Sequence, residues 1–154
     1  MLLSIKNYWN LLPDFSLSHI LLRIPLALIF IQQGLSKMPF DPAGGEAFGL
    51  PTLIWWVVAF GEVAAGVGLL LGALTTLPGL RDNYVVAVTG DLVTRFCGIT
   101  MCCIATGVIW VVIRPDDLLT FVMTDYMHFS LWCGGLYFAL RGNWAVTTRI
   151  KSVQ

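Results

Sequence analysis

Residues 52–71 read TLIWWVVAFGEVAAGVGLLL, and this one stretch decides the fold class. Glu62 is its only charged residue. A helix needs about 20 mostly apolar residues to cross the ~30 Å hydrocarbon core of a bilayer. Trp55 and Trp56 lie near the start of the stretch, and tryptophans are common where a helix meets the membrane–water interface. The stretch therefore predicts a transmembrane helix.

Three further apolar stretches of similar character lie at about residues 17–36, 92–113 and 126–140. Of the 154 residues, 57% are hydrophobic and only 12% are charged, against roughly 25% charged in soluble domains. Basic and acidic residues number nine each, so no charge excess points to a nucleic-acid partner. These features predict an all-α integral membrane protein, a four-transmembrane-helix bundle forming a single domain over residues 1–154.

The segment ahead of the first apolar stretch has its own pattern. Apolar residues recur at helical spacing within residues 2–12, with polar residues opposite them, which predicts a short N-terminal interfacial helix. A cleaved signal peptide is the alternative. Arg23 inside the following apolar run, and the lack of a small-residue cleavage motif, argue against a signal peptide.

Basic residues divide unevenly between the two ends of the predicted bundle. Two lie at one end, Lys37 and Arg114. Six lie at or near the other end: Lys6, Arg81, Arg95, Arg141, Arg149 and Lys151. Because lysine and arginine accumulate on the cytoplasmic side of membrane proteins, the prediction is an N-in/C-in topology with both termini cytoplasmic. The expected location is the cytoplasmic (inner) membrane.

Small residues follow the second span at a spacing that favours close helix packing. In lipid, helices associate through close backbone contact, and small residues four apart permit it. We expect these residues to pack the bundle itself, and a partner membrane subunit is the alternative. The predicted helix-packing residues are Gly61, Ala64, Gly68, Gly72 and, in the fourth span, Gly135.

Three ionisable residues, Arg23, Glu62 and Arg95, lie within or at the edge of the predicted spans. Each costs ~3 kcal/mol or more at the centre of a bilayer, so each needs an explanation. At 1.5 Å per residue, Glu62 is ~15 Å and Arg23 ~9 Å from opposite boundaries, a depth difference of only ~6 Å. This predicts an intramembrane Arg23–Glu62 pair shared with Arg95. It would fix helix register or form a polar pocket for a quinone head group or a proton; the alternative is a neutral Glu62 with arginines that reach the interface.

Other polar residues near the ends of the spans are weaker candidates. Gln32 and Gln33 lie near the outer end of the first span, where they would line a pocket or make local polar contacts. His19 and His128 begin spans at opposite faces, so they cannot ligate one haem within a single chain, although a haem shared with another subunit stays open. We expect interfacial roles for both histidines.

The cysteines show no metal-binding pattern. They are Cys97, Cys102, Cys103 and Cys133, all in apolar runs, with no C-x-x-C pair and no His/Cys spacing typical of zinc. The expected role is that of small buried hydrophobic residues, with a redox thiol pair as the alternative. No metal site is predicted.

Several motifs occur in a familiar order. LRIPL at residues 22–26 and FIQQGLSK at residues 30–37 resemble the opening span of the DoxX/DoxD-like membrane proteins. The pair Gly61-Glu62 with the glycines after it is similar to the second span of that family, and Thr94-Arg95 resembles the start of its third span. The resemblance covers about residues 20–100, and Gly142-Asn143-Trp144 matches the family's end only loosely.

The resemblance carries expectations of its own. It implies a four-helix bundle, with Arg23, Glu62 and Arg95 as interior polar residues. It also implies a quinone-linked redox complex, because DoxD is a subunit of thiosulfate:quinone oxidoreductase. We expect no covalently bound cofactor. We expect a quinone or a structural lipid to bind non-covalently.

The sequence shows no catalytic motif, so we expect an accessory membrane subunit of a larger redox or electron-transfer assembly, structural or quinone-proximal. Two alternatives stay open. One is a catalytic quinone-reducing subunit built around Arg23, Glu62 and Arg95. The other is a small transporter or permeation module with Glu62 in a proton path.

Overall fold

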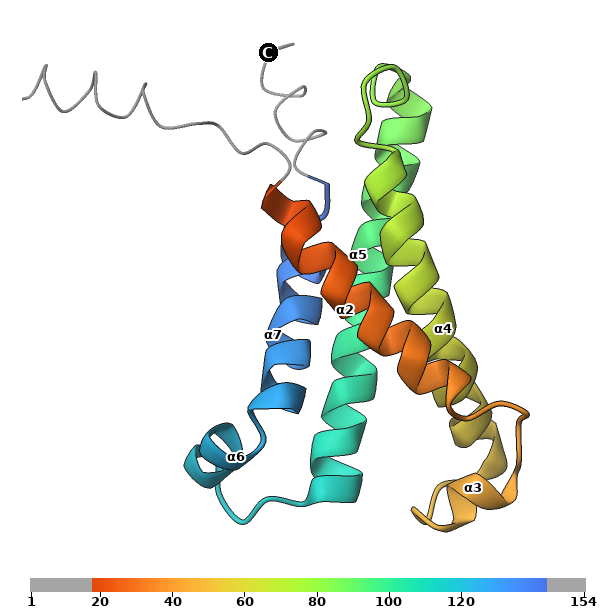
Figure 1. The fold of residues 1–154 in the computed structure, drawn as a ribbon, viewed down its shortest axis with the longest axis vertical. Helices are drawn as coiled ribbons and strands as arrows, with labels where there is room; N and C mark the ends of the chain where they lie inside the picture. The colour runs from red at the N-terminus through yellow and green to blue at the C-terminus, as the bar shows by residue number, and fades with distance from the viewer. Residues whose placement is uncertain (1–17, 144–154) are drawn as a thin grey trace, which may run out of the picture.

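A computed structural model describes residues 18–143, and within this range the chain is helical and contains no strand (Figure 1). The predicted interfacial helix at residues 2–12 lies outside the described residues. The all-α prediction is confirmed for the described part of the chain. Its helices are α2 Ser18–Leu35, α3 Ala43–Glu46, α4 Thr52–Leu74, α5 Tyr84–Gly107 with a π-helical continuation η1 Val108–Ile113, α6 Leu118–Thr124 and α7 Tyr126–Arg141.

Two of these helices are long and apolar enough to cross a membrane. They are α4, with a mean hydropathy of 2.0, and the continuous helix Tyr84–Ile113, with 2.3. Only 33% and 28% of the residues in their most apolar windows are buried, so most of these apolar side chains face outward. The core helix of a soluble protein buries its apolar face. The outward apolar surface is therefore typical of helices that face lipid. The shorter helix His19–Leu35 is also apolar.

The helix ends differ from the predicted spans in two places. α4 continues to Leu74 rather than ending near residue 71. α5 begins at Tyr84 rather than near residue 92, so residues 84–91 belong to the helix and not to the connection before it. Asn83 explains the early start, because its side chain accepts hydrogen bonds from the backbone N–H groups of Val85 and Val86 and so caps the helix.

Of the two short helices, α6 is capped at its start by a side chain. Asp117 caps α6 by accepting hydrogen bonds from the backbone N–H and the hydroxyl of Thr120. These bonds hold the pKa of the Asp117 carboxyl below its usual range. α3 belongs to the proline- and glycine-rich segment between α2 and α4 and packs against α4. Both short helices lie at the same end of the bundle (Figure 1).

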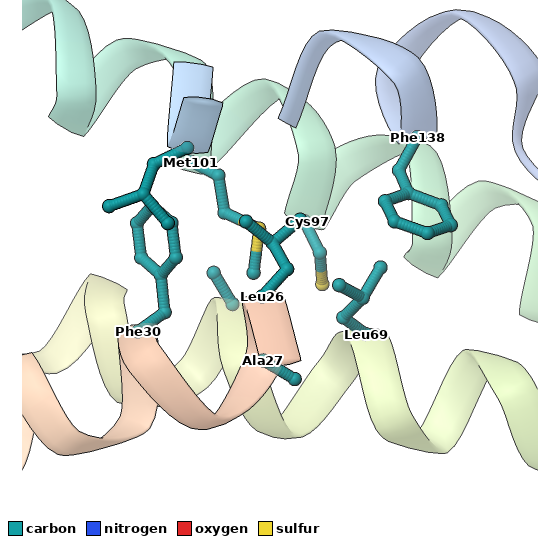
Figure 2. Packing of buried hydrophobic residues seen from close by; sticks show 9 residues of the cluster. Leu26, Ala27, Phe30, Leu69, Cys97, Met101 and Phe138 are labelled. Carbon is teal, nitrogen blue, oxygen red and sulfur yellow. The ribbon is translucent and has the colours of Figure 1, made fainter. Parts of the chain in front are cut away.

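The four long helices meet around one apolar core. α5 packs against both α4 and α7, while α2 packs along α4 and crosses it obliquely (Figure 1). Figure 2 shows side chains from all four helices meeting: Leu26, Ala27 and Phe30 from α2, Leu69 from α4, Cys97 and Met101 from α5, and Phe138 from α7. The core therefore ties α7 to α2 as well as to α5.

Glycines set the closest helix contacts. A Cβ atom added at Gly98 of α5 would lie 2.6 Å from the carbonyl oxygen of Gly135 in α7. One added at Gly66 of α4 would lie 2.7 Å from the carbonyl oxygen of Ala27 in α2. Real side chains do not tolerate such distances to backbone atoms, so both helix pairs depend on these glycines.

The predicted packing residues divide between the inside and the surface. Gly72 and Gly135 are buried, and Gly61 and Gly68 face α5, where an added Cβ would meet Ile104 and Cys97 respectively. Ala64 is exposed, so its predicted role in packing the bundle is wrong. The physical reason is that α4 is contacted on two faces, by α5 and by α2, and Ala64 lies on neither.

The α5–α7 contact can be tested with one added side chain. Gly98→Val should lower stability by about 1–3 kcal/mol, because the side chain is forced against the backbone of α7. The measurement is the thermal unfolding midpoint of the purified protein in mild detergent. Gly107→Ala is the matched control on the same helix, where no atom lies within 4 Å of an added Cβ. Equal midpoints for Gly98→Val and wild type would contradict the packing described here.

Candidate functional site

Arg23 is a fully buried cation near the end of the bundle where α7 stops. It lies in α2 with 1% of its surface exposed. Its Nη1 donates to the carbonyl oxygen of Leu69 at 2.9 Å and to Oγ1 of Thr94 at 3.3 Å, and its Nη2 donates to Oδ1 of Asn143 at 2.8 Å. The guanidinium also lies 4.8 Å from the ring centroid of Phe138. Neutral oxygens and an aromatic face therefore stabilise this charge.

Asn143 completes the network from the end of α7. Its amide nitrogen donates to the carbonyl oxygen of Gly72 at 2.9 Å and to Oγ1 of Thr75 at 3.1 Å. Its Oδ1 accepts from Thr94 as well as from Arg23, and its backbone N–H donates to Asp91 at 2.6 Å. One asparagine thus joins α7 to α2, α4 and α5. Sequence analysis quoted Asn143 only within the Gly142-Asn143-Trp144 segment and gave it no site role, because a polar residue after a helix-ending glycine carries no periodic signal.

Arg95 lies in a different part of the same network. Its Nε donates to Asp91 at 2.8 Å, and its Nη atoms donate to the last carbonyl oxygens of α7, those of Ala139, Leu140 and Arg141. Carbonyl groups at a helix end lack partners within the helix and attract a cation. Arg95 therefore caps α7. It is connected to Arg23 through Asp91 and Asn143 rather than directly.

The predicted Arg23–Glu62 pair is wrong. Glu62 is 6% exposed in its side chain, and its Oε2 lies 2.6 Å from Nζ of Lys37. Arg23 instead meets Leu69, which lies seven residues further along α4 than Glu62, or ~10 Å at 1.5 Å per residue. The depth estimate failed because it ignored the oblique crossing of α2 over α4 (Figure 1). It also ignored Lys37, which follows the end of α2 and contacts Glu62.

Lys37 has two further interactions beside Glu62. Its Nζ donates to the backbone carbonyl oxygen of Gln33 at 2.9 Å and lies 5.7 Å from the ring centroid of Trp55. The lysine follows α2, the glutamate and the tryptophan lie on α4, and both charges are largely buried. Sequence reasoning placed Lys37 at the outer boundary and did not pair it with Glu62.

A cavity of about 860 Å³ opens around this ion pair. It lies at the end of the bundle that carries α3 and α6, and its walls come from α2, α4, α5, η1 and α7 and from the segment between α2 and α4. Gln33 lines it, whereas Gln32 is exposed and is not among the lining residues. Most lining residues are apolar, for example Ile29, Phe30, Ile54, Val58, Ile104, Val108 and Leu131.

The segment between α2 and α4 is fastened over the cavity by Trp55. The indole Nε1 donates to the carbonyl oxygen of Asp41 at 3.0 Å. Added Cβ atoms at Gly44 and Gly45 would lie 3.1 Å and 2.8 Å from Trp55 atoms, so this glycine pair lets the backbone lie directly against the ring system. The tryptophan therefore forms a wall of the cavity and holds the segment between α2 and α4 against α4.

His128 and Cys103 also line the cavity. The Nδ1 atom of His128 lies 2.8 Å and 2.7 Å from the two carboxylate oxygens of Asp125, the residue before α7. All four cysteines are free thiols. Cys97 is buried as expected, whereas Cys103 and Cys133 are exposed, so the expectation of burial is wrong for these two.

The two polar systems suit different tasks. The Arg23 network is enclosed and consists of hydrogen bonds among helices, so its role is to stabilise the arrangement of the helices. The Lys37–Glu62 pair lies in a cavity with apolar walls and few polar groups, which is the usual composition of a small-molecule site. The cavity is therefore the candidate functional site.

The structural role of the Arg23 network predicts strong coupling between Arg23 and Asn143. Each single change, Arg23→Met or Asn143→Ala, should lower stability by about 1.5–3 kcal/mol, because a charged or buried hydrogen bond is lost. The double variant should be less destabilised than the sum by about 1 kcal/mol or more.

Thermal or denaturant unfolding in mild detergent measures this cycle. The control cycle combines Arg23→Met with Lys37→Met, which belong to separate networks and should add. Additive effects of Arg23→Met and Asn143→Ala would contradict the network as drawn.

Comparison with known proteins locates one family segment. The DoxX family model matches residues 18–81, which hold α2, α3 and α4 with Arg23, Lys37 and Glu62. The match ends before Arg95, so the resemblance of that region stays a prediction. No curated protein and no solved structure gives a significant match. The resemblance to the DoxX/DoxD-like family is thus confirmed over residues 18–81, and with its two long apolar helices the chain is a membrane protein carrying a DoxX segment.

Proposed function

We propose that this chain is a small membrane subunit of a redox assembly and that its cavity binds a quinone. The observation that carries the proposal is the cavity of about 860 Å³ with apolar walls and a buried Lys37–Glu62 pair. Sites for small molecules generally have volumes of roughly 300–1,000 Å³, apolar linings and a few well-placed polar groups. The dimensions and the lining both fit a substituted quinone ring.

The polar groups suit a ring that carries two carbonyl oxygens. An ammonium group has three N–H donors. Lys37 uses two of them within the described part of the chain, on Glu62 and on the Gln33 carbonyl, which leaves a donor for a ligand oxygen. Trp55 supplies an aromatic wall beside the ammonium. The apolar side chains of α2, α5 and η1 would accommodate ring substituents and the start of an isoprenoid tail.

The subunit role is supported by the family resemblance and by the apolar outward faces of α4 and α5. Residues 18–81 match the DoxX family model. The resemblance to the DoxX/DoxD-like proteins implies a quinone-linked complex, because DoxD is a subunit of thiosulfate:quinone oxidoreductase. The outward faces of α4 and α5 are apolar, with Phe60, Val67, Leu92 and Phe96 exposed. Such faces serve contact with lipid and with helices of a partner subunit. In this proposal the partner supplies the electrons, and this chain holds the quinone near them.

The proposed topology has four spans, α2, α4, the continuous helix α5–η1 and α7, with both termini in the cytoplasm. It is supported by the arrangement of the turns, since α3 and α6 lie at one end of the bundle and the α4–α5 connection lies at the other (Figure 1). α7 has 16 residues and so spans ~24 Å, the shortest of the four. The basic residues Arg81, Arg95 and Arg141 lie toward the end proposed to face the cytoplasm, which favours the inner membrane.

Filling the cavity tests the proposed quinone site. Wild-type protein in mild detergent should bind 2,3-dimethyl-1,4-naphthoquinone, a neutral quinone whose two substituted ring carbons resist addition of cysteine thiols. Val58→Trp should weaken binding about tenfold or more, because the larger side chain occupies the cavity that Val58 lines. Isothermal titration calorimetry measures both dissociation constants.

Val67→Trp is the matched control, since Val67 lies on the same helix, is exposed and does not line the cavity. Its dissociation constant should equal the wild-type value. Absence of measurable binding to folded wild-type protein, or equal weakening by both variants, would contradict the proposal.

The proposed topology is tested with reporters fused after Gln154 and expressed in a bacterium. A green fluorescent protein fusion should fluoresce and an alkaline phosphatase fusion should be inactive, because the positive-inside bias retains that end in the cytoplasm. The same reporters fused after Pro115, between η1 and α6, should give the opposite pair of results. Phosphatase activity at the C-terminal fusion would overturn the proposed orientation.

A further inference from the structure

The cavity is lined by an imidazole as well as by the Lys37–Glu62 pair. His128 lies in the first turn of α7 and lines the cavity. Its Nδ1 atom is held between the two carboxylate oxygens of Asp125, at 2.8 Å and 2.7 Å. The side chains of both residues are about one quarter exposed, at 25% and 23%. The histidine is therefore fixed in orientation by a carboxylate and remains partly accessible.

The contact with Asp125 decides which ring nitrogen serves a ligand. A carboxylate accepts hydrogen bonds, so it selects the state of the ring with a proton on Nδ1. The opposite nitrogen, Nε2, then has a lone pair when the ring is neutral and an N–H when the ring is charged. In the described part of the chain Nε2 makes no hydrogen bond, so it is available to a ligand.

We propose that His128 exchanges a proton with the hydroxyl group of a ligand in this cavity, and that Asp125 positions its ring. The inference rests on the proposed quinone function and names the chemistry at one end of the ligand. The neutral imidazole accepts the proton of a hydroquinone hydroxyl at Nε2. The O–H bond breaks and an N–H bond forms, which leaves a hydroquinone monoanion beside an imidazolium. The proton then passes to water at the membrane surface.

The other titratable groups on the cavity are engaged or differ in chemistry. Glu62 of α4 is bound to Lys37, which follows α2. The Oδ1 atom of Asp41, in the segment before α3, accepts from the backbone N–H of Ala43 at 2.9 Å. Cys103 is the titratable side chain that α5 contributes to the lining. The His128–Asp125 dyad is the lining group that combines a fixed ring with an exchangeable proton.

Two ligands of nearly equal shape separate proton exchange from simple binding. They are the neutral 2,3-dimethyl-1,4-naphthoquinone and 2-hydroxy-3-methyl-1,4-naphthoquinone, whose hydroxyl is acidic and ionised at neutral pH. The dyad carries one negative charge when the imidazole is neutral and none when it is protonated. The anionic ligand should therefore bind more tightly as the pH falls, and it should take up a proton on binding. The neutral ligand should do neither.

Calorimetric titrations at about pH 6 and about pH 8 span much of the range in which histidines change charge. Wild-type protein should bind the anionic ligand about fivefold or more tightly at the lower pH. Titrations in two buffers of different ionisation enthalpy should show proton uptake. In His128→Gln the anionic ligand should lose both the pH dependence and the proton uptake, and the neutral ligand should show no pH dependence in either protein.

Asp125→Asn tests the positioning role without removing the helix cap, because asparagine caps helices as well as aspartate does. Loss of the carboxylate lets the ring rotate and change tautomer, so Nε2 is no longer held toward the ligand and the affinity step for the anionic ligand should become smaller. A role confined to capping α7 through the His128 N–H, at 3.2 Å in the structure, would leave the step in place.

The outcomes distinguish this inference from the function on which it rests. If the neutral ligand binds but the anionic ligand shows no pH step, or keeps its step in His128→Gln, proton exchange at His128 is wrong and the quinone site stands. If neither ligand binds the folded wild-type protein, the quinone site itself is wrong. An unchanged step in Asp125→Asn would overturn the role given to Asp125.

Discussion

The structure depends on the burial of one guanidinium group. Arg23 is 1% exposed, and a charge removed from water is tolerated only when acceptors are well placed around it. Both Nη atoms meet such acceptors, whereas Nε has no hydrogen-bond partner in the described part of the chain. The acceptors come from Leu69 on α4, Thr94 on α5 and Asn143 just after α7, so every long helix meets at this residue. Lipid-facing helices have little hydrophobic drive to associate. The buried arginine supplies directional bonds that select one arrangement of the four helices.

Because Arg23 is bound within its own network, the charged side chains form two separate systems. The cavity lies between the helices beside the second system. Arg23 and Arg95 belong to the network around Asn143, at the end of the bundle where α7 stops. Lys37 and Glu62 form a pair of their own toward the other end, so Glu62 needs no arginine. Helices α2, α4, α5 and α7 are drawn together by Arg23 and by the Gly98–Gly135 contact, while the cavity lies further along them. The proposed ligand site thus lies beside the Lys37–Glu62 pair, which does not belong to the Arg23 network.

Periodicity and composition predicted the all-helical fold and the extents of α2 and α7 to within a residue at each end, because long apolar runs leave few alternatives. They also located Arg23 and Glu62 as buried charges. They could not predict which polar side chains contact one another. Depth counted along straight, parallel helices paired Arg23 with Glu62, whereas the crossing of α2 over α4 brings Arg23 to Leu69 and allows Lys37 to return to Glu62. Asn143 and Asp125 carry no helical periodicity, and their roles arise only from tertiary contacts.

The central claim is that the cavity beside Lys37 and Glu62 holds a quinone. The most direct measurement is a cryo-electron microscopy or crystal structure of the protein prepared in lipid nanodiscs or bicelles with a short-chain quinone. The account predicts ring-shaped density within the cavity, with one oxygen in hydrogen-bond reach of Lys37 and the ring beside Trp55. Quinone density on the outward faces of α4 or α5, with the cavity filled by protein side chains, would contradict it.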